Sequence, residues 1–259
     1  MEIPIYKVDA FTNKVFSGNP AAVCPLEYWL EDSMMQSIAK ENNLSETAFF
    51  VRQASDYYIR WFTPEIEVDL CGHATLASAF VYFNYIAPSS INIEFQSRSG
   101  PLSVEKGDGM LSMNFPSQPP CPCAAPDNLV KALNIKPAEV LSSQDYFVVY
   151  ENEKQIRELS PLMYNLKQID KRGVIATAPG DEADFVSRCF FPRLGIDEDP
   201  VTGSAHSALI PYWSKRYEKK ELHARQISDR GGELFCTNFT DRVIISGHAV
   251  MFMRGIVYI

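Results

Sequence analysis

The sequence lacks the long apolar runs and the basic clusters that would point to a membrane or to nucleic acid. No apolar window approaches the ~20 residues that a membrane-spanning helix needs. Lys and Arg together number 24 against 32 Asp and Glu, which gives a net charge of −8. Because an acidic chain repels a phosphate backbone, neither nucleic acid nor a membrane is an expected partner.

A secretory signal and a disulfide framework are also missing. The N-terminal residues carry no basic segment followed by an apolar stretch, so we expect no signal peptide. Six cysteines are spaced irregularly over 259 residues, unlike those of a small disulfide-stapled domain. Together these absences predict a cytoplasmic protein with reduced thiols.

Motifs for nucleotides, flavins and catalytic metals are absent as well. The chain has no P-loop, no G-x-G-x-x-G, no G-x-S-x-G and no H-E-x-x-H. Asp69, Cys71 and His73 lie close together, but their spacing does not match common zinc patterns and no second Cys/His pair follows. We therefore expect neither a cofactor nor a metal.

What the sequence does contain is the composition of a globular protein, with 46% apolar and 22% charged residues. Its length suits two domains of about 130 residues each. Four prolines fall within the nine residues 115–123, near the middle of the chain. Proline cannot donate to a strand ladder, so this segment is predicted to be an extended linker between the domains.

Two stretches rich in small apolar residues are predicted to be buried helices, 72–83 and 202–212. Their first glycines are 203 − 72 = 131 residues apart, about half the chain, which suggests a duplicated domain. Three further helices are expected at 31–43, 129–133 and 161–166. Strands are expected at 3–10, 21–24, 47–52, 57–63, 91–95, 100–105, 110–114, 146–150, 174–177, 225–228, 233–237, 243–248 and 255–259.

The N-termini of the two buried helices are candidate anion sites, because their first amides are unpaired and carry partial positive charge. Two such termini facing one cleft would hold a carboxylate. Alternatively, Gly72 and Gly203 serve only to make tight turns.

Glu46 and three further polar residues are candidates for proton chemistry. Beside the apolar strand that follows it, Glu46 could be desolvated and act as a general acid–base, or it could lie on an exposed turn. His73 could polarise a substrate oxygen as a neutral ring, and Cys71 could be a thiolate activated by the helix terminus, or both could simply pack in the core. Asp199 either complements the helix dipole or orients a substrate group.

Four motifs, in this order and at these separations, resemble the PhzF-like family of phenazine-biosynthesis isomerases, and the resemblance covers essentially the whole chain. They are Asp9-Ala10-Phe11 with Gly18-Asn19-Pro20-Ala21, Asn43-Leu44-Ser45-Glu46-Thr47, Phe62-Thr63-Pro64 with Cys71-Gly72-His73-Ala74, and Glu198-Asp199-Pro200-Val201-Thr202-Gly203-Ser204-Ala205.

The resemblance implies an α+β fold shared with diaminopimelate epimerase. It has two similar domains, each a curved, mostly antiparallel sheet wrapped around a central helix. The last strand is expected to return to the first domain, which gives residues 1–117 plus 250–259 for one domain and 118–249 for the other. Homodimers are common in the family, so a homodimer is expected.

The resemblance also implies roles for the candidate residues in a cofactor-independent isomerase. Glu46, His73 and Asp199 take the catalytic positions, with Glu46 moving a proton between carbons of a small carboxylated metabolite in an interdomain cleft. The substrate-binding positions fall on Asn19, Ser45, Gly72, Gly203 and Ser204.

Two other functions remain open from the sequence. The related epimerases use two cysteines, and here Cys71 occupies the first of those positions while Asp199 stands at the second. An amino-acid racemase or epimerase using Cys71 with Glu46 or Asp199 is therefore one alternative. The other is a non-catalytic small-molecule-binding or interaction protein on the same fold.

Overall fold

The computed structural model describes residues 1–259 and divides into two compact units. Unit 1 comprises residues 1–115 and 245–259, and unit 2 comprises residues 116–244. The predicted boundaries lay at 117/118 and 249/250, so the C-terminal segment of unit 1 begins five residues earlier than predicted. None of the helices combines the length and the apolarity that crossing a bilayer requires.

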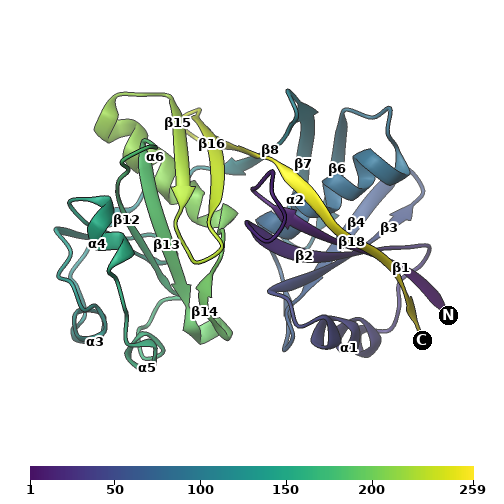
Figure 1. Ribbon diagram of the computed structural model, residues 1–259, viewed down its shortest axis with the longest axis horizontal. Helices are drawn as coiled ribbons and strands as arrows, with labels where there is room; N and C mark the ends of the chain where they lie inside the picture. The colour runs from purple at the N-terminus through teal and green to yellow at the C-terminus, as the bar shows by residue number, and fades with distance from the viewer. The chain divides into compact units, whose positions relative to one another are not determined.

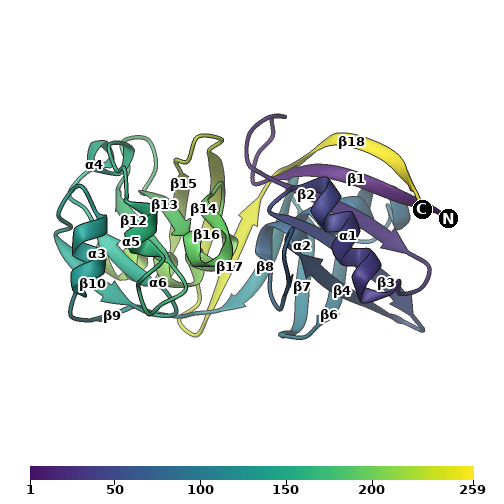
Figure 2. The same cartoon turned by 90° about the horizontal axis from the view of Figure 1, so that it is seen from below.

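Unit 1 is a strongly curved sheet with one helix inside it and one outside (Figures 1 and 2). Its strands are β1 (Glu2–Ala10), β2 (Asn19–Leu26), β3 (Glu46–Gln53), β4 (Asp56–Phe62), β5 (Glu67–Val68), β6 (Asn92–Ser97), β7 (Gly100–Gly107), β8 (Met110–Pro116) and β18 (Ala249–Tyr258). The helices are α1 (Asp32–Asn42) and α2 (Gly72–Val81), and α2 continues into the π-helical turn η1 (Tyr82–Ile86).

Unit 2 repeats this plan with shorter outer helices. Its strands are β9 (Cys121–Pro122), β10 (Glu139–Ser142), β11 (Tyr146–Val149), β12 (Val174–Pro179), β13 (Phe185–Phe191), β14 (Ile196–Asp199), β15 (Glu221–Gln226) and β16 (Gly232–Asn238). The helices are α3 (Asp127–Ala132), α4 (Glu153–Arg157), α5 (Met163–Leu166) and α6 (His206–Tyr217), with 3-10 turns η2 (Pro192–Leu194) and η3 (Gly203–Ala205). Strand β17 (Arg242–Gly247) returns the chain to unit 1.

The two sheets share strand order and direction. In unit 1 the order β1-β2-β3-β4-β6-β7 has parallel neighbours at β2–β3 and β4–β6 and antiparallel ones elsewhere. In unit 2 the order β10-β11-β12-β13-β15-β16 has parallel neighbours at β11–β12 and β13–β15. In each unit the second parallel connection contains the central helix, α2 or α6. The duplication that the glycine spacing suggested is therefore present in the topology.

Successive side chains of a strand point to opposite faces of the sheet, and in unit 1 both faces carry apolar residues. On the outer face, Ala22, Cys24 and Phe49 form one core with Met35 and Ile38 of α1. On the inner face the sheet curves around α2, of whose ten residues all but Phe80 are buried. A helix apolar on all sides is stable only when it is covered on all sides, so α2 confirms the predicted buried helix.

In unit 2 the central helix contains a proline that the fold accommodates by one hydrogen bond. Pro211 of α6 has no N–H, so it cannot bond to the carbonyl of Ser207 four residues earlier. The Gln118 amide of the proline-rich linker donates to that carbonyl instead, at 2.8 Å. The carbonyl therefore stays satisfied inside the unit, and the linker is tied to the helix that it precedes.

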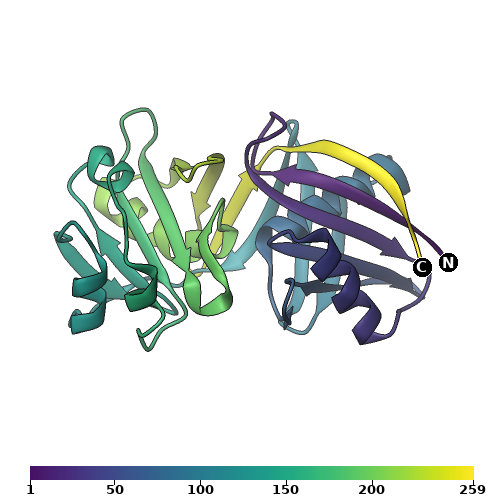
Figure 3. The same cartoon turned by 60° about the horizontal axis from the view of Figure 1, so that its bottom comes forward.

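The last strand is longer than the sequence predicted. β18 runs from Ala249 to Tyr258 and pairs antiparallel with the whole of β1, so both chain ends lie side by side (Figure 3). The pattern indicated only residues 255–259, because Arg254 and Gly255 interrupt the apolar alternation. Pairing with β1, rather than local propensity, sets its length.

Candidate active site

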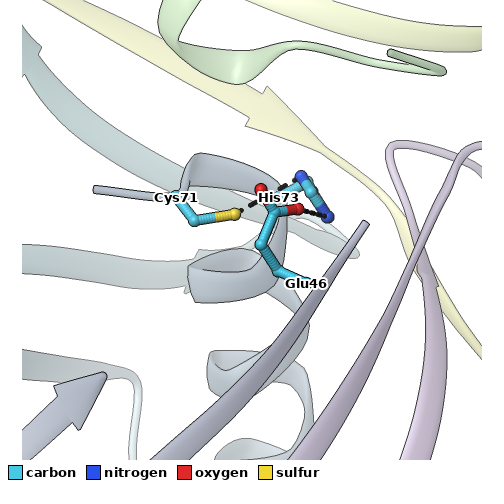
Figure 4. A group of neighbouring side chains, drawn as sticks. All are labelled: Glu46, Cys71 and His73. Carbon is cyan, nitrogen blue, oxygen red and sulfur yellow. Dashed lines mark hydrogen bonds and ion pairs between the residues drawn. The ribbon is translucent and has the colours of Figure 1, made fainter. Parts of the chain in front are cut away.

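Two strands and the start of α2 bring four polar side chains together in unit 1, and Figure 4 shows three of them, Glu46, Cys71 and His73. In the parallel β2–β3 pair Ala21 stands opposite Glu46, and Asn19 lies two residues before Ala21 on the same strand. Because side chains two residues apart share a face, Asn19 and Glu46 both point inward, toward α2. The N-terminus of α2 supplies Cys71 and His73.

The start of α2 leaves its first amides available. Cys71 is the N-cap residue in an extended conformation, and no side chain caps the helix. The Cys71 carbonyl accepts from the Thr75 amide at 3.2 Å and from the Thr75 hydroxyl at 2.5 Å. The amides of Gly72, His73 and Ala74 precede this first intrahelical bond, so the terminus can bind an anion.

His73 is the centre of the cluster. Its Nε2 lies 3.2 Å from Oε2 of Glu46, in a contact that lacks the alignment of a hydrogen bond. Its Nδ1 lies 3.1 Å from Nδ2 of Asn19 and 3.5 Å from Sγ of Cys71. All four side chains are buried; Glu46 is the most exposed of them, at only 9%. Glu46 therefore does not lie on an exposed turn.

Burial keeps the His73 ring neutral. Removal from water lowers the pKa of His73 from its ordinary value of 6.5 to about 3. The 3.2 Å contact with Glu46 is therefore between a neutral imidazole and a carboxyl group at neutral pH, not between two full charges. A neutral ring here donates or accepts one hydrogen bond at each nitrogen, depending on its tautomer.

The same residues offer the donor set of a metal site, which spacing along the sequence did not predict. One ligand atom each from Glu46, Cys71 and His73 lie within 4.8 Å of one another. Carboxylate, thiolate and imidazole together suit Zn²⁺. Binding through Nδ1 of His73 would displace the hydrogen bond with Asn19.

Unit 2 holds the second set of predicted residues, at the start of its central helix. Asp199 is 7% exposed and accepts a 2.5 Å hydrogen bond from the Thr202 hydroxyl. Gly203 is buried and opens the turn η3, and Ser204 beside it is half-buried. The N-terminus of this helix also lacks a side-chain cap. Ser45 of unit 1 is half-buried directly before β3.

Sequence reasoning missed Gln226, which holds the Asp199 loop in place. This fully buried residue ends β15; its Nε2 donates to the Asp199 carbonyl at 2.6 Å and its Oε1 accepts from the Thr202 amide at 2.8 Å. The sequence did hold a sign of this role: Gln226 is a polar residue two positions after Ala224 and four after Leu222, on the same buried face of the strand. The strand was expected at 225–228 instead of 221–226, so this register was not recognised.

Comparison with known proteins places this chain and its fold in one family. The family described as phenazine biosynthesis-like protein matches residues 8–255. An uncharacterized isomerase of Pseudomonas aeruginosa is 51% identical over 259 residues, with both chains covered completely. The crystal structure of a phenazine biosynthesis protein of the PhzF family from Enterococcus faecalis has a TM-score of 0.97 at 50% identity and 100% coverage of both chains.

A more distant structure confirms the predicted fold class. A hydroxyproline epimerase from Agrobacterium vitis has a TM-score of 0.63 at 8% identity, covering 99% of this chain and 92% of its own. At that identity the likeness concerns the fold alone. The α+β architecture with epimerase-like units is therefore shared well beyond the family.

The two buried histidines predict a loss of stability in mild acid. Burial lowers the pKa of His73 to about 3 and that of His206 to about 4, whereas the unfolded chain protonates near 6.5. The contribution of these two neutral histidines to the free energy of unfolding is complete above pH 6.5 and declines as the pH falls. Each should remove about 1.4 kcal/mol of unfolding free energy per pH unit below 6.5, or about 2 kcal/mol at pH 5.

Urea denaturation between pH 7.5 and 5 measures this dependence. Replacing His206 with Gln should remove the contribution of one histidine to the slope, and adding His73→Gln should remove the second. A wild-type free energy that stays constant from pH 7 to 5 would contradict the neutral, buried state of both rings.

Proposed function

The chain belongs to the phenazine biosynthesis-like protein family and is an isomerase of that family, and we propose that it moves a proton between carbons of a small carboxylated metabolite without a cofactor. The observation that carries this proposal is the buried Glu46 carboxyl beside a neutral His73, at the uncapped N-terminus of α2.

The chemistry follows from what each group can do. The substrate carboxylate binds the free amides of the first turn of α2, which also favour the negative charge that develops on the substrate. Glu46, as the carboxylate, takes a proton from one carbon, and the electron pair of the broken C–H bond delocalises toward the bound carboxylate. The protonated Glu46 then returns the proton to another carbon, so atoms and charges balance over the cycle.

Roles for the residues of unit 2 extend the proposal. Asp199 orients a polar group of the substrate, and Gly203 and Ser204 provide further hydrogen-bond donors. Closure of an interdomain cleft would exclude water and strengthen these contacts. Support within unit 2 is the network of Asp199, Thr202 and Gln226, which holds a carboxylate beside an uncapped helix terminus.

One observation favours a second enzymatic function, a racemase or epimerase. The Sγ of Cys71 lies 3.5 Å from Nδ1 of His73, at the N-cap of α2. A thiol in that position could exchange a proton with an amino-acid α-carbon while Glu46 or Asp199 acts from the opposite face.

We also propose a cytoplasmic homodimer. All six cysteines are free thiols, which suits a reducing compartment. Strand β18 lies at an edge of unit 1 and presents exposed apolar side chains, namely Phe252, Met253, Ile256 and Tyr258. A long apolar edge strand invites association, and a second copy of the same chain would cover it.

Glu46→Gln should abolish turnover while leaving the fold intact, because an amide cannot accept a proton from carbon. We expect a fall of about 10²- to 10⁴-fold. Proton NMR in D2O, with a pool of small cyclic and α-amino carboxylic acids, detects deuterium incorporation and new isomers. The exposed Glu41→Gln is the matched control and should retain full activity.

The outcomes separate catalysis from binding. Unchanged deuterium incorporation in Glu46→Gln would refute its role as the base. A wild-type protein that binds acids from this pool but neither exchanges nor isomerises them would favour a non-catalytic binding protein.

Cys71→Ala separates the proton-shift isomerase from the racemase. The isomerase should keep at least about a tenth of its activity, since the thiol only contacts His73. A racemase should lose at least about 10²-fold, because the thiol is then one of its two acid–base groups. The same NMR assay, with chiral analysis of the products, gives the answer.

Charges placed on β18 should weaken the dimer. Ile256→Lys with Tyr258→Lys introduces like charges into an interface built from two copies of this strand. Light scattering after size exclusion should give a dimer for the wild type and a concentration-dependent shift to monomer for the variant. A wild type that is monomeric at all concentrations would contradict the proposal.

A further inference from the structure

The two nitrogens of His73 face chemically opposite neighbours. Nδ1 faces the amide nitrogen of Asn19 at 3.1 Å and the thiol of Cys71 at 3.5 Å. Nε2 faces the carboxylate oxygen of Glu46 at 3.2 Å (Figure 4). The first two neighbours are hydrogen-bond donors, whereas an ionised carboxylate only accepts.

A neutral imidazole carries one N–H and one lone pair, so these neighbours select its tautomer. With the proton on Nε2, the lone pair of Nδ1 meets the donors, and the positive end of the N–H lies on the side of the carboxylate, although this contact is not aligned as a hydrogen bond. With the proton on Nδ1, an N–H would meet an amide N–H, and a lone pair would meet the carboxylate oxygen. Both ends of the ring therefore favour the Nε2–H form, and burial prevents water from compensating the other one.

The backbone around Asn19 holds its side chain in the position from which it can select the tautomer of His73. It begins β2, where it pairs with Ala10 of β1, and its side chain is fully buried. Gly18 before it has a φ of +66°, and a Cβ there would lie 2.2 Å from the Ala10 carbonyl oxygen. Only glycine fits this turn, so the backbone sets the amide of Asn19 against His73 before any substrate arrives.

We propose that Asn19 is a positioning residue that keeps His73 in the Nε2–H tautomer and occupies the lone pair of its Nδ1, so that proton transfer falls to Glu46 and Cys71 stays a thiol. The second half rests on the function proposed above. The family resemblance implied substrate binding for Asn19, and the contact with His73 adds this positioning role.

The consequence for Cys71 follows from the same lone pair. A thiol can donate to Nδ1 of the Nε2–H tautomer, but a thiolate needs an N–H there. Forming the thiolate would transfer the thiol proton to Nδ1 and leave His73 as an imidazolium, which the burial of the ring disfavours. The Asn19 amide, which lies closer to Nδ1 than the thiol does, competes with Cys71 for the one lone pair that could accept the thiol proton.

The tautomer is measurable without substrate by ¹⁵N NMR of the histidine-labelled full-length protein, prepared with a chelator. His206 provides an internal reference of the opposite form, because its Nδ1 lies 2.9 Å from the Thr202 carbonyl and must donate to it. We expect the bare nitrogen to be Nδ1 in His73 and Nε2 in His206, with His73→Gln assigning the signals. A bare Nε2 in His73 would overturn the proposal.

Asn19→Asp tests the role of the amide. The new carboxylate accepts from Nδ1, so His73 should gain a proton there while His206 stays unchanged, and solvent deuterium exchange should fall by about 10- to 100-fold. Asn92→Asp makes the same change at an exposed residue of β6, and it should alter neither the ¹⁵N signals of His73 nor the rate of deuterium exchange. An Asn19→Asp protein whose His73 spectrum matches the wild type would refute the role.

Asn19→Ala serves if the aspartate variant does not fold. Without the amide, only Glu46 and Cys71 favour the Nε2–H form, so the Nδ1–H form should become detectable beside it, and an unchanged spectrum would again refute the role. Because these spectra need no turnover, they stand apart from the assay of Glu46→Gln. The tautomer can be as proposed while Glu46→Gln retains exchange, in which case the function fails and the positioning role does not.

Discussion

Burial of the whole of α2 is the constraint from which the rest of unit 1 follows. A helix with nine of its ten residues buried needs a sheet that curves around it, and small residues such as Ala74 and Ala77 allow the strands to come close. Its N-terminus then opens inside the protein, where the first amides have no side-chain cap. A buried, uncapped helix start is costly in an apolar environment, and it becomes useful when an anionic ligand supplies the missing acceptors.

Duplication gave both units this frame, and the two helix starts differ in chemistry. In unit 1 the neighbouring strands contribute Glu46 and Asn19, so the first turn of the helix meets proton-transfer groups. In unit 2 the corresponding start lies beside Asp199, which the buried Gln226 holds through the backbone. One fold therefore surrounds its two central-helix starts with different polar groups, and the difference is confined to a few side chains.

Sequence patterns predicted the elements whose signal is local and missed those that depend on distant partners. The helix at 72–81 is visible because its residues are apolar on all sides, and Glu46 stands out as an acid before an apolar strand. Strand β13 was missed because Arg188 interrupts its apolar run; in the structure this guanidinium is bound by Glu198 and by two main-chain carbonyls. The bond between Asn19 and His73 joins residues 54 apart, and no spacing along the chain encodes it.

The cluster in unit 1 shows why identifying reactive residues is not enough to assign a mechanism. Glu46 and Cys71 are both capable of acid–base chemistry, and both contact the same imidazole, one at each nitrogen. That ring has a single proton to place while burial holds its pKa near 3, so it cannot serve both groups in the same way. Whichever nitrogen carries the proton decides which neighbour is held as a charged acceptor and which stays protonated. The amide of Asn19 biases that choice from the turn between two strands, so the reaction type is decided partly by a residue that need not touch the substrate.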